Sequence, residues 1–332
     1  MKHPPTFQTL LQSFFTDRLM GQRNASPHTI AAYRDTFRLL FGYTAQHLGK
    51  PPSALTLTDL DCVLIGAFLD HLEQHRGNTA RSRNARLAAI HSFFRYVAFQ
   101  MPEQSALIQR VLAIPSKKHE RALVEYLTAE EVHALLEAPD RNVHAGRRDH
   151  ALLLLAIQTG LRVSELVGLN CRDIFLDVGA HVRCLGKGRK TRCTPLTRST
   201  ATVIKAWLKE RGGQEAEPLF PNARGGRFSA DGVQFILAHH VATARQQCPS
   251  MKKKRISPHV LRHTAAMNLL HAGADAVAIA LWLGHEGIET VHVYVEADLT
   301  AKEKILAKTA APEASAKRFR PTDALLAFLK DL

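Results

Sequence analysis

The residues best suited to chemistry in this sequence of 332 residues gather between Ser257 and Val295. This segment carries histidines and an arginine at helix-like spacing and closes with a single tyrosine: His259, Arg262, His263, His271, His285, His292 and Tyr294. Three kinds of site use such side chains. They are a metal centre, a set of hydrogen-bonded core histidines, and a pocket that binds a phosphate and attacks it.

A metal centre explains the spacing only in part. His259 and His263 lie four residues apart and could share a zinc ion on one face of a helix. However, no glutamate follows the first histidine, and no acidic or cysteine third ligand is evident. A phosphate explains more, because Arg262 projects from the same helical face as His259. Its guanidinium stays charged and donates two parallel hydrogen bonds to an anion.

A phosphate under attack gains negative charge, so a second arginine is expected elsewhere in the chain. Arg162, in the stretch TGLRVSEL, follows Gly160 at a predicted helix start, a position that favours anions. Glu165, three residues later, can brace Arg162 or a neighbouring histidine. The simpler alternative for Arg162 is an ordinary surface arginine.

Tyr294 is the candidate nucleophile. The other tyrosines lie in or near apolar helical patterns and are expected to be structural: Tyr33, Tyr43, Tyr96 and Tyr126. A phenol with an ordinary pKa near 10 needs cationic neighbours before it can attack. A departing sugar oxygen needs a proton donor, and the stretch GKGRKTR offers two, Lys187 at the tip of a predicted hairpin and Lys190.

Together these motifs resemble the signature of the tyrosine recombinases, the phage integrase family. The stretches TGLRVSELVGL, GKGRKTR, HVLRH and LGH occur in that family's order, and Tyr294 follows His285 by nine residues. The match covers about residues 127–295, and the helices before it are similar to the family's core-binding domain. Each motif is weak alone, whereas five in order are specific.

The resemblance implies a role for each matched residue. Arg162 and Arg262 would clamp the scissile phosphate. His259 and His285 would hydrogen-bond its oxygens, with His259 also a candidate proton acceptor for the tyrosine. Lys187 would be the general acid, Tyr294 the nucleophile and Glu165 an accessory residue. The three remaining histidines match no catalytic position and are expected to be structural: His263, His271 and His292.

The resemblance also implies the reaction and its partners. Tyr294 would attack a DNA phosphate to give a 3′-phosphotyrosyl link and a free 5′ hydroxyl, which would then attack a partner strand. No metal and no nucleotide cofactor is needed, because the bond energy stays in the phosphodiester. The partners would be double-stranded DNA and other protomers, in a homotetramer on two recombination sites or a hetero-tetramer with a related recombinase. A helix in the tail TDALLAFLKDL could dock on a neighbouring protomer.

The elements that position these residues are predicted to be mainly α, with a small antiparallel β-sheet. Ser26 and Pro27 open one helix, Thr58 is the expected cap of a second, and Thr128 with Glu131 forms a capping box. Short runs around the stretch GKGRKTR predict three strands. Four later helices are expected at residues 197–211, 230–247, 258–271 and 274–283.

We expect an N-terminal helical core-binding (SAM-like) domain at residues 1–114, a linker at 115–126, the catalytic domain at 127–310, and a tail at 311–332. The predicted third helix has a basic face with Arg81, Arg83 and Arg86, and no acid occurs between Glu73 and Glu103. This face and the run Lys252, Lys253, Lys254 and Arg255 are the expected phosphate contacts. The net charge of +14, from 44 Lys and Arg against 30 Asp and Glu, favours such a polyanionic partner.

Composition excludes several other classes. The five cysteines are widely spaced without a CxxC pair, so neither a disulfide framework nor a zinc ribbon is expected, and a reducing cytoplasm fits best. No apolar run reaches membrane-spanning length, and no membrane partner is expected. Two alternatives to the recombinase stay open, a relaxing topoisomerase of type IB chemistry and a catalytically silent DNA-binding regulator of the same fold. The sequence does not distinguish chromosome-dimer resolution from phage integration or transposon movement.

Overall fold

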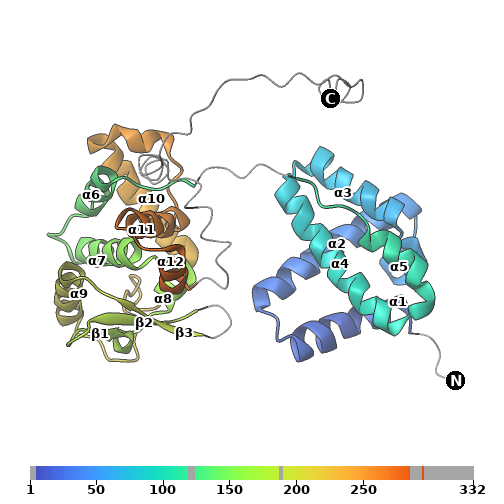
Figure 1. Ribbon diagram of the computed structural model, residues 1–332, viewed down its shortest axis with the longest axis horizontal. Coiled ribbons are helices and arrows are strands. Elements are labelled where there is room, and N and C mark those ends of the chain that lie inside the picture. The colour runs from blue at the N-terminus through green and yellow to red at the C-terminus, as the bar shows by residue number, and fades with distance from the viewer. Residues whose placement is uncertain (1–4, 119–123, 187–189, 285–293, 295–332) are drawn as a thin grey trace, which may run out of the picture. The chain divides into compact units, whose positions relative to one another are not determined.

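A computed structural model describes residues 5–118, 124–186, 190–284 and 294. The chain divides into two compact units, Met1–Arg121 and Ala122–Leu332 (Figure 1). The dividing point lies inside residues 115–126, the segment that we expect to link two domains. Among the described residues, no helix combines the length and the apolar character needed to cross a membrane.

The N-terminal unit is helical throughout its described part. Its main elements are α1 (Phe7–Ser13), the π-helix η1 (Phe14–Gln22), α2 (Pro27–Leu48), α3 (Cys62–Arg76), α4 (Ala80–Gln100) and α5 (Ser105–Leu112). Short 3-10 turns join them: η2 (Pro52–Ala54), η3 (Leu57–Asp59) and η4 (Pro102–Gln104). The predicted start of α2 is confirmed, since the side chain of Ser26 accepts a hydrogen bond from Thr29 N.

The predicted cap of α3 is wrong. Thr58 lies inside the 3-10 turn η3, where Asp59 accepts from the backbone N–H of Thr56. The helix itself begins at Cys62, because the side chain of Asp61 accepts a hydrogen bond of 2.8 Å from Leu64 N. Aspartate and threonine are both good N-cap residues. Which of them caps the helix depends on where the backbone N–H groups of the first turn are left without an acceptor.

Aromatic side chains fill the core of the N-terminal unit. The ring of Phe93 on α4 meets those of Phe14 and Phe37 at centroid distances of 5.4 Å, and Phe93 is fully buried. Because Phe93 points into the core, the opposite face of α4 is exposed. This exposed face carries Arg81 and Arg95.

The C-terminal unit combines helices with one small sheet. Its helices are α6 (Ala129–Glu137), α7 (His144–Thr159), α8 (Val163–Gly168), α9 (Arg198–Arg211), α10 (Ala230–Gln247), α11 (Pro258–His271) and α12 (Ala276–Leu283), with 3-10 turns η5 (Cys171–Asp173) and η7 (Pro249–Lys253). Its strands are β1 (Ile174–Phe175), β2 (His181–Leu185) and β3 (Thr191–Pro195). Helix α7 is buried on nearly all sides and packs against α9 and α11.

The three predicted strands are confirmed as an antiparallel sheet in the order β1-β2-β3. The pairing of Leu185 with Thr191 and a hydrogen bond of 2.8 Å from Gly186 N to Lys190 O close a hairpin whose tip, residues 187–189, lies outside the described residues. The four later helices follow within about two residues of their predicted bounds. The predicted helix of the tail also lies outside the described residues.

Candidate active site

Tyr294, the candidate nucleophile, is buried against α11 with 2% of its surface exposed. Its hydroxyl oxygen lies 3.0 Å from Nδ1 of His263, and the two rings meet edge to face. The ring of His259, one turn earlier on α11, packs against that of His263 with centroids 4.2 Å apart. Burial raises the pKa of the Tyr294 phenol, against the opposing effect of the charges on Arg262 and Arg162. Sequence reasoning missed the contact with His263.

Arg262 is held inside the C-terminal unit, with 2% of its surface exposed. Its Nη1 donates to Gly160 O at 2.7 Å and its Nη2 donates to Leu283 O at 2.8 Å. Glycine is required at position 160, because it ends α7 with φ of 64° and a Cβ there would lie 2.6 Å from the Leu283 side chain. Burial, together with the charge of Arg162, lowers the pKa of Arg262 to about 10, so the guanidinium stays charged at neutral pH.

Arg162 caps the start of α8 and lies beside the same end of α12. Its backbone N–H donates to Oε2 of Glu165 at 2.7 Å, and its Nη1 donates to Oε1 of that carboxylate at 2.9 Å. Its Nη2 donates to Gly284 O at 3.2 Å. The carbonyl groups of two successive residues, Leu283 and Gly284, therefore hold Arg262 and Arg162 respectively. This shared attachment brings together two arginines that are 100 positions apart in the chain.

Arg192 on β3 completes the cluster and was not among the predicted site residues. Its Nη1 and Nη2 each donate to one oxygen of Glu165 at 2.8 Å. Burial alone would raise the pKa of Glu165, but the bonds from Arg192 and Arg162 outweigh it and hold that pKa below its ordinary value. The one available sequence signal was alternation, since Arg192 shares a strand face with the buried Thr194.

Two predicted catalytic residues, Lys187 and His285, lie outside the described residues. Lys190, the competing candidate for the general acid, is exposed at the base of the hairpin. His285 directly follows Gly284, whose carbonyl accepts from Arg162. Among the residues that the structure describes, no group of three His, Cys, Asp or Glu side chains is placed to hold a metal ion.

The predicted phosphate contacts on α4 divide into two kinds. Arg81 is exposed, as we expect of a residue that meets DNA. Arg83 is 5% exposed and donates to Pro115 O at 2.9 Å, so its guanidinium has little surface left for a phosphate. Arg86 is half-buried, and its Nη1 donates to Thr36 Oγ1 at 3.1 Å. The geometry therefore corrects the prediction for Arg83 and weakens it for Arg86.

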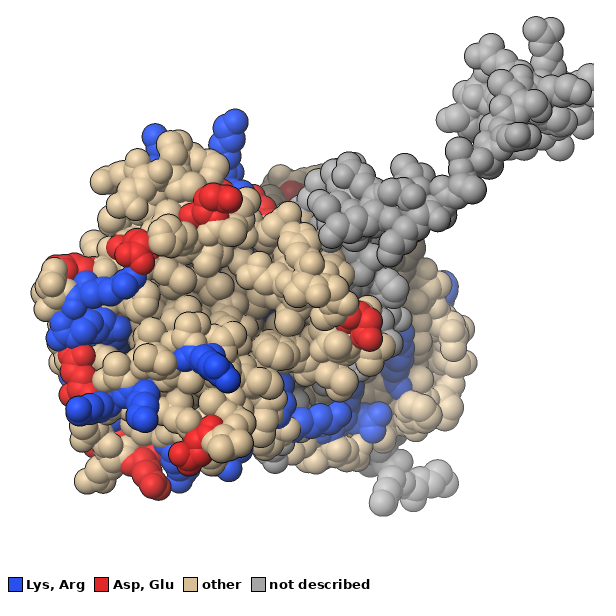
Figure 2. Space-filling view, turned by 60° about the vertical axis from the view of Figure 1, so that its left-hand side comes forward, with Lys and Arg blue, Asp and Glu red and all other residues tan. Residues whose placement is uncertain are grey.

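The basic run after η7 divides in the same way. Lys252, Lys253 and Arg255 are exposed. Lys254 instead donates to Tyr126 O at 2.8 Å and pairs with the buried carboxylate of Glu131, so it holds α6 in place. Figure 2 shows acidic side chains among basic ones on the face it presents, so the positive charge there does not form an unbroken patch.

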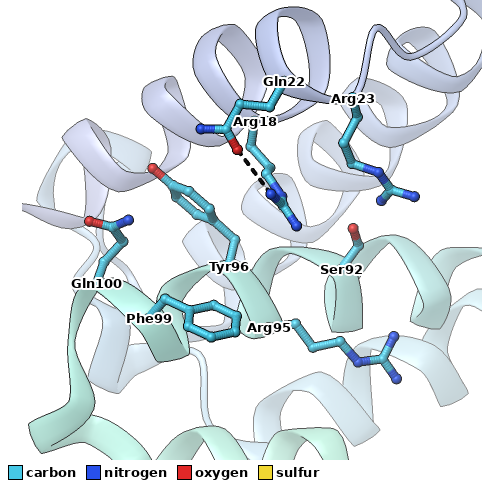
Figure 3. Close-up of a pocket in the computed structure, with 8 residues that line it drawn as sticks. All are labelled: Arg18, Gln22, Arg23, Ser92, Arg95, Tyr96, Phe99 and Gln100. Atoms are coloured by element: carbon cyan, nitrogen blue, oxygen red, sulfur yellow. Dashed lines mark hydrogen bonds between the residues drawn. The ribbon is translucent and has the colours of Figure 1, made fainter.

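A hollow of about 460 Å³ in the N-terminal unit gathers three more arginines (Figure 3). Arg18 and Arg23 come from η1 and its C-terminal cap, and Arg95 comes from α4. Ser92 and the exposed ring of Phe99 lie beside them, and Arg18 donates to Gln22 Oε1 at 2.9 Å. Among the described residues that line this hollow, none carries a carboxylate.

The chain matches two families of protein domains. Residues 125–300 match the phage integrase family, and residues 13–100 match the phage integrase N-terminal SAM-like domain. The first match covers more than half of this chain, so the chain belongs to the phage integrase family. These proteins are tyrosine-type site-specific recombinases.

Several relatives are similar over most of their length. A Sinorhizobium fredii protein named as an integrase/recombinase, y4rC, is 57% identical over 323 residues, which is 97% of each chain. Tyrosine recombinase XerC of Pelobacter propionicus is 37% identical over 286 residues, covering 86% of this chain and 90% of the relative.

Solved structures share the fold at lower identity. A post-cleavage complex of the XerH site-specific recombinase with its difH substrate has a TM-score of 0.69 at 22% identity, covering 89% of this chain and 84% of the other. The Tn1549 transposon integrase with transposon right end DNA has a TM-score of 0.68 at 16% identity, covering 91% of this chain and 99% of the other. The predicted mainly helical fold, with SAM-like and catalytic domains, is confirmed.

Proposed function

We propose that this chain cleaves and rejoins the strands of double-stranded DNA, with Tyr294 as the nucleophile. One observation carries the proposal. The buried phenol of Tyr294 lies within the electrostatic reach of Arg162 and Arg262, and both arginines are attached to the same end of α12. A phosphate held by these two cations would lie next to the tyrosine hydroxyl.

The chemistry follows from these positions. Two N–H groups of Arg262 are used by backbone carbonyls, and a guanidinium has five, so donors remain for phosphate oxygens. As the Tyr294 oxygen bonds to phosphorus, negative charge grows on those oxygens, and fixed donors that need no rearrangement stabilise it most. Glu165 keeps Arg162 in its orientation, and His259 and His285 would donate to the same oxygens.

The P–O5′ bond breaks in the same step, leaving a 3′-phosphotyrosyl link. The departing 5′ oxygen takes a proton from Lys187, with Lys190 the alternative donor on the same hairpin. In the second half of the reaction, a 5′ hydroxyl of the partner strand attacks the phosphotyrosyl link and releases Tyr294. Energy is conserved in the phosphodiester, so we propose that neither a metal nor a nucleotide takes part.

The relatives suggest how DNA is held. The similar structures are of XerH and the Tn1549 integrase in complexes with DNA, and of a λ integrase dimer bound to a core site. We propose the same partner here, contacted by exposed cations that include Arg81, Lys252 and Arg255. We further propose a tetramer on two sites, either of this chain alone or with a related recombinase, acting in the cytoplasm.

A suicide duplex tests the proposal. The duplex carries the repeats that flank the gene, with a nick just 3′ of the expected cleavage point so that the short 5′-hydroxyl fragment diffuses away. We expect a covalent protein–DNA adduct on a denaturing gel. Tyr294→Phe abolishes the adduct, whereas the matched change Tyr126→Phe keeps it. An adduct that survives Tyr294→Phe, or no adduct with any flanking repeat, contradicts the proposal.

Strand exchange then separates the proposal from its alternatives. Two labelled duplexes should yield recombinant products and a four-way junction on native gels, in particles whose mass corresponds to four protomers. Relaxation of supercoils without exchange indicates a topoisomerase, and DNA binding without an adduct indicates a silent regulator. No observation of the fold or the site favours either of these.

A further inference from the structure

The tyrosine hydroxyl is placed against a histidine that the family signature does not include. Nδ1 of His263 lies 3.0 Å from the Tyr294 oxygen, which is a normal hydrogen-bond distance. His263 directly follows the phosphate-binding Arg262 on α11, so one helical turn carries both groups. Arg262 and Thr264, the residues on either side of His263, are buried, and the imidazole itself is half-buried where it meets Tyr294.

The nucleophile needs a proton acceptor. Burial raises the pKa of the Tyr294 phenol above its ordinary value near 10, so the hydroxyl is protonated at neutral pH. Its proton must leave as the bond to phosphorus forms. An imidazole has an ordinary pKa near 6.5 and accepts a proton readily in its neutral form.

We propose that His263 is the group that takes the proton from Tyr294 during strand cleavage, and returns it during rejoining. This inference rests on the proposed function. In cleavage, the proton passes from Oη to Nδ1 of His263 while the Oη–P bond forms and the P–O5′ bond breaks. The departing oxygen receives a different proton, from Lys187 or Lys190. In rejoining, the imidazolium of His263 gives its proton back to the released phenolate oxygen.

The neighbouring histidine keeps a different role. His259 is exposed, and its ring packs against His263 with centroids 4.2 Å apart. From this position His259 can donate to a phosphate oxygen while its ring supports that of His263. Arg262 directly precedes His263 on α11, and the charges of Arg262 and Arg162 act on the Tyr294 phenol in the direction that favours its ionised form.

The test uses the full-length chain on the suicide duplex with two leaving groups. One duplex has the natural 5′ oxygen, and the other has a bridging sulfur, which departs as a thiolate without needing a proton. We expect His263→Asn to slow adduct formation about 100-fold or more on both duplexes. Lys187→Met, by contrast, should recover on the sulfur duplex. The same change at the opposite end of α11, His271→Asn, should leave the rate near that of the wild type.

Chemical rescue distinguishes proton transfer from a structural role. Added imidazole should restore adduct formation by His263→Ala, and a series of substituted azoles should rescue in the order of their pKa. If His263 only packs against Tyr294, rescue does not follow azole basicity. Rescue of His259→Ala in place of His263→Ala would identify His259 as the acceptor and overturn the inference.

These outcomes are separable from failure of the proposed function. If the wild type forms an adduct that depends on Tyr294, and His263→Asn forms it at the same rate on both duplexes, only the inference is wrong. If the wild type forms no adduct, the proposed function fails first. Circular dichroism melting of each variant excludes loss of the fold as the cause of a slow rate.

Discussion

One buried arginine of the C-terminal domain and three exposed arginines of the N-terminal domain are used in opposite ways. In the C-terminal domain, Arg262 is almost fully buried, and each of its terminal nitrogens donates to a backbone carbonyl. In the N-terminal domain, Arg18, Arg23 and Arg95 are exposed around an open hollow whose described lining residues include no carboxylate. The first arrangement fixes one charge at one point, whereas the second presents several charges to solvent.

This difference separates catalysis from affinity. A charge fixed in a medium of low dielectric interacts strongly with a phosphate and needs no reorganisation when charge develops. Exposed charges are screened by salt and act mainly by displacing the counterions of DNA. We therefore expect the buried arginine to control the rate of cleavage, and the exposed arginines to control binding.

Arg262→Lys should produce the largest effect. Lysine keeps the charge but loses the planar fork that spans Gly160 and Leu283 while facing a phosphate. We expect adduct formation to fall on the order of 1,000-fold, with DNA affinity close to that of the wild type. Single-turnover adduct formation and gel shifts measure the two quantities. A loss of binding that matches the loss of rate would remove the distinction between the two regions.

Glu165→Gln should produce the next largest effect, because it leaves Arg162 and Arg192 sharing a neutral partner. A carboxyl whose pKa is lower in the folded state stabilises the fold above its unfolded-state pKa. That stabilisation is lost as the pH falls through the folded-state pKa. The wild type should therefore exceed the variant in free energy of unfolding by about 3 kcal/mol at neutral pH, and the gap should close on acidification. Urea unfolding at several pH values measures it, and a gap independent of pH would contradict the assignment.

Local features of these sites could be predicted from the sequence, and long-range ones could not. Arg162 and Glu165 lie three residues apart, so the helix geometry alone brings them together. The bond between Arg192 and Glu165 spans 27 positions and depends on where the sheet packs relative to α8, which no local pattern in the sequence specifies.

The contact of His263 with Tyr294 also spans a long stretch of chain, 31 positions, and depends on how segments pack. Arg83 shows the same limit, because the carbonyl of Pro115 that removes it from the surface comes 32 positions later. A basic face can be recognised from one helix, whereas the use of each charge depends on segments elsewhere in the chain.

Two arginines on one helix sharpen the comparison within the N-terminal domain. Arg83→Gln should lower the free energy of unfolding by about 1 to 3 kcal/mol, because it leaves Pro115 O without its donor. Arg81→Gln should leave stability unchanged and instead weaken DNA binding, lowering the slope of log affinity against log salt by about 1. Thermal melting and salt titrations of both variants give the result. Equal behaviour of the two would mean that burial does not decide how each arginine is used.

Arg95→Lys should produce the smallest effect, and it applies the same substitution as Arg262→Lys. Arg95 is exposed beside Ser92, and among the described residues none accepts a hydrogen bond from its guanidinium. If it acts on DNA through charge, lysine releases as many counterions, and affinity should stay within about twofold while Arg95→Gln loses affinity. Equilibrium binding at several salt concentrations measures both variants. A large loss of affinity with lysine would mean that DNA binding at the hollow requires the planar guanidinium. Side-chain geometry, and not charge alone, would then matter in both domains.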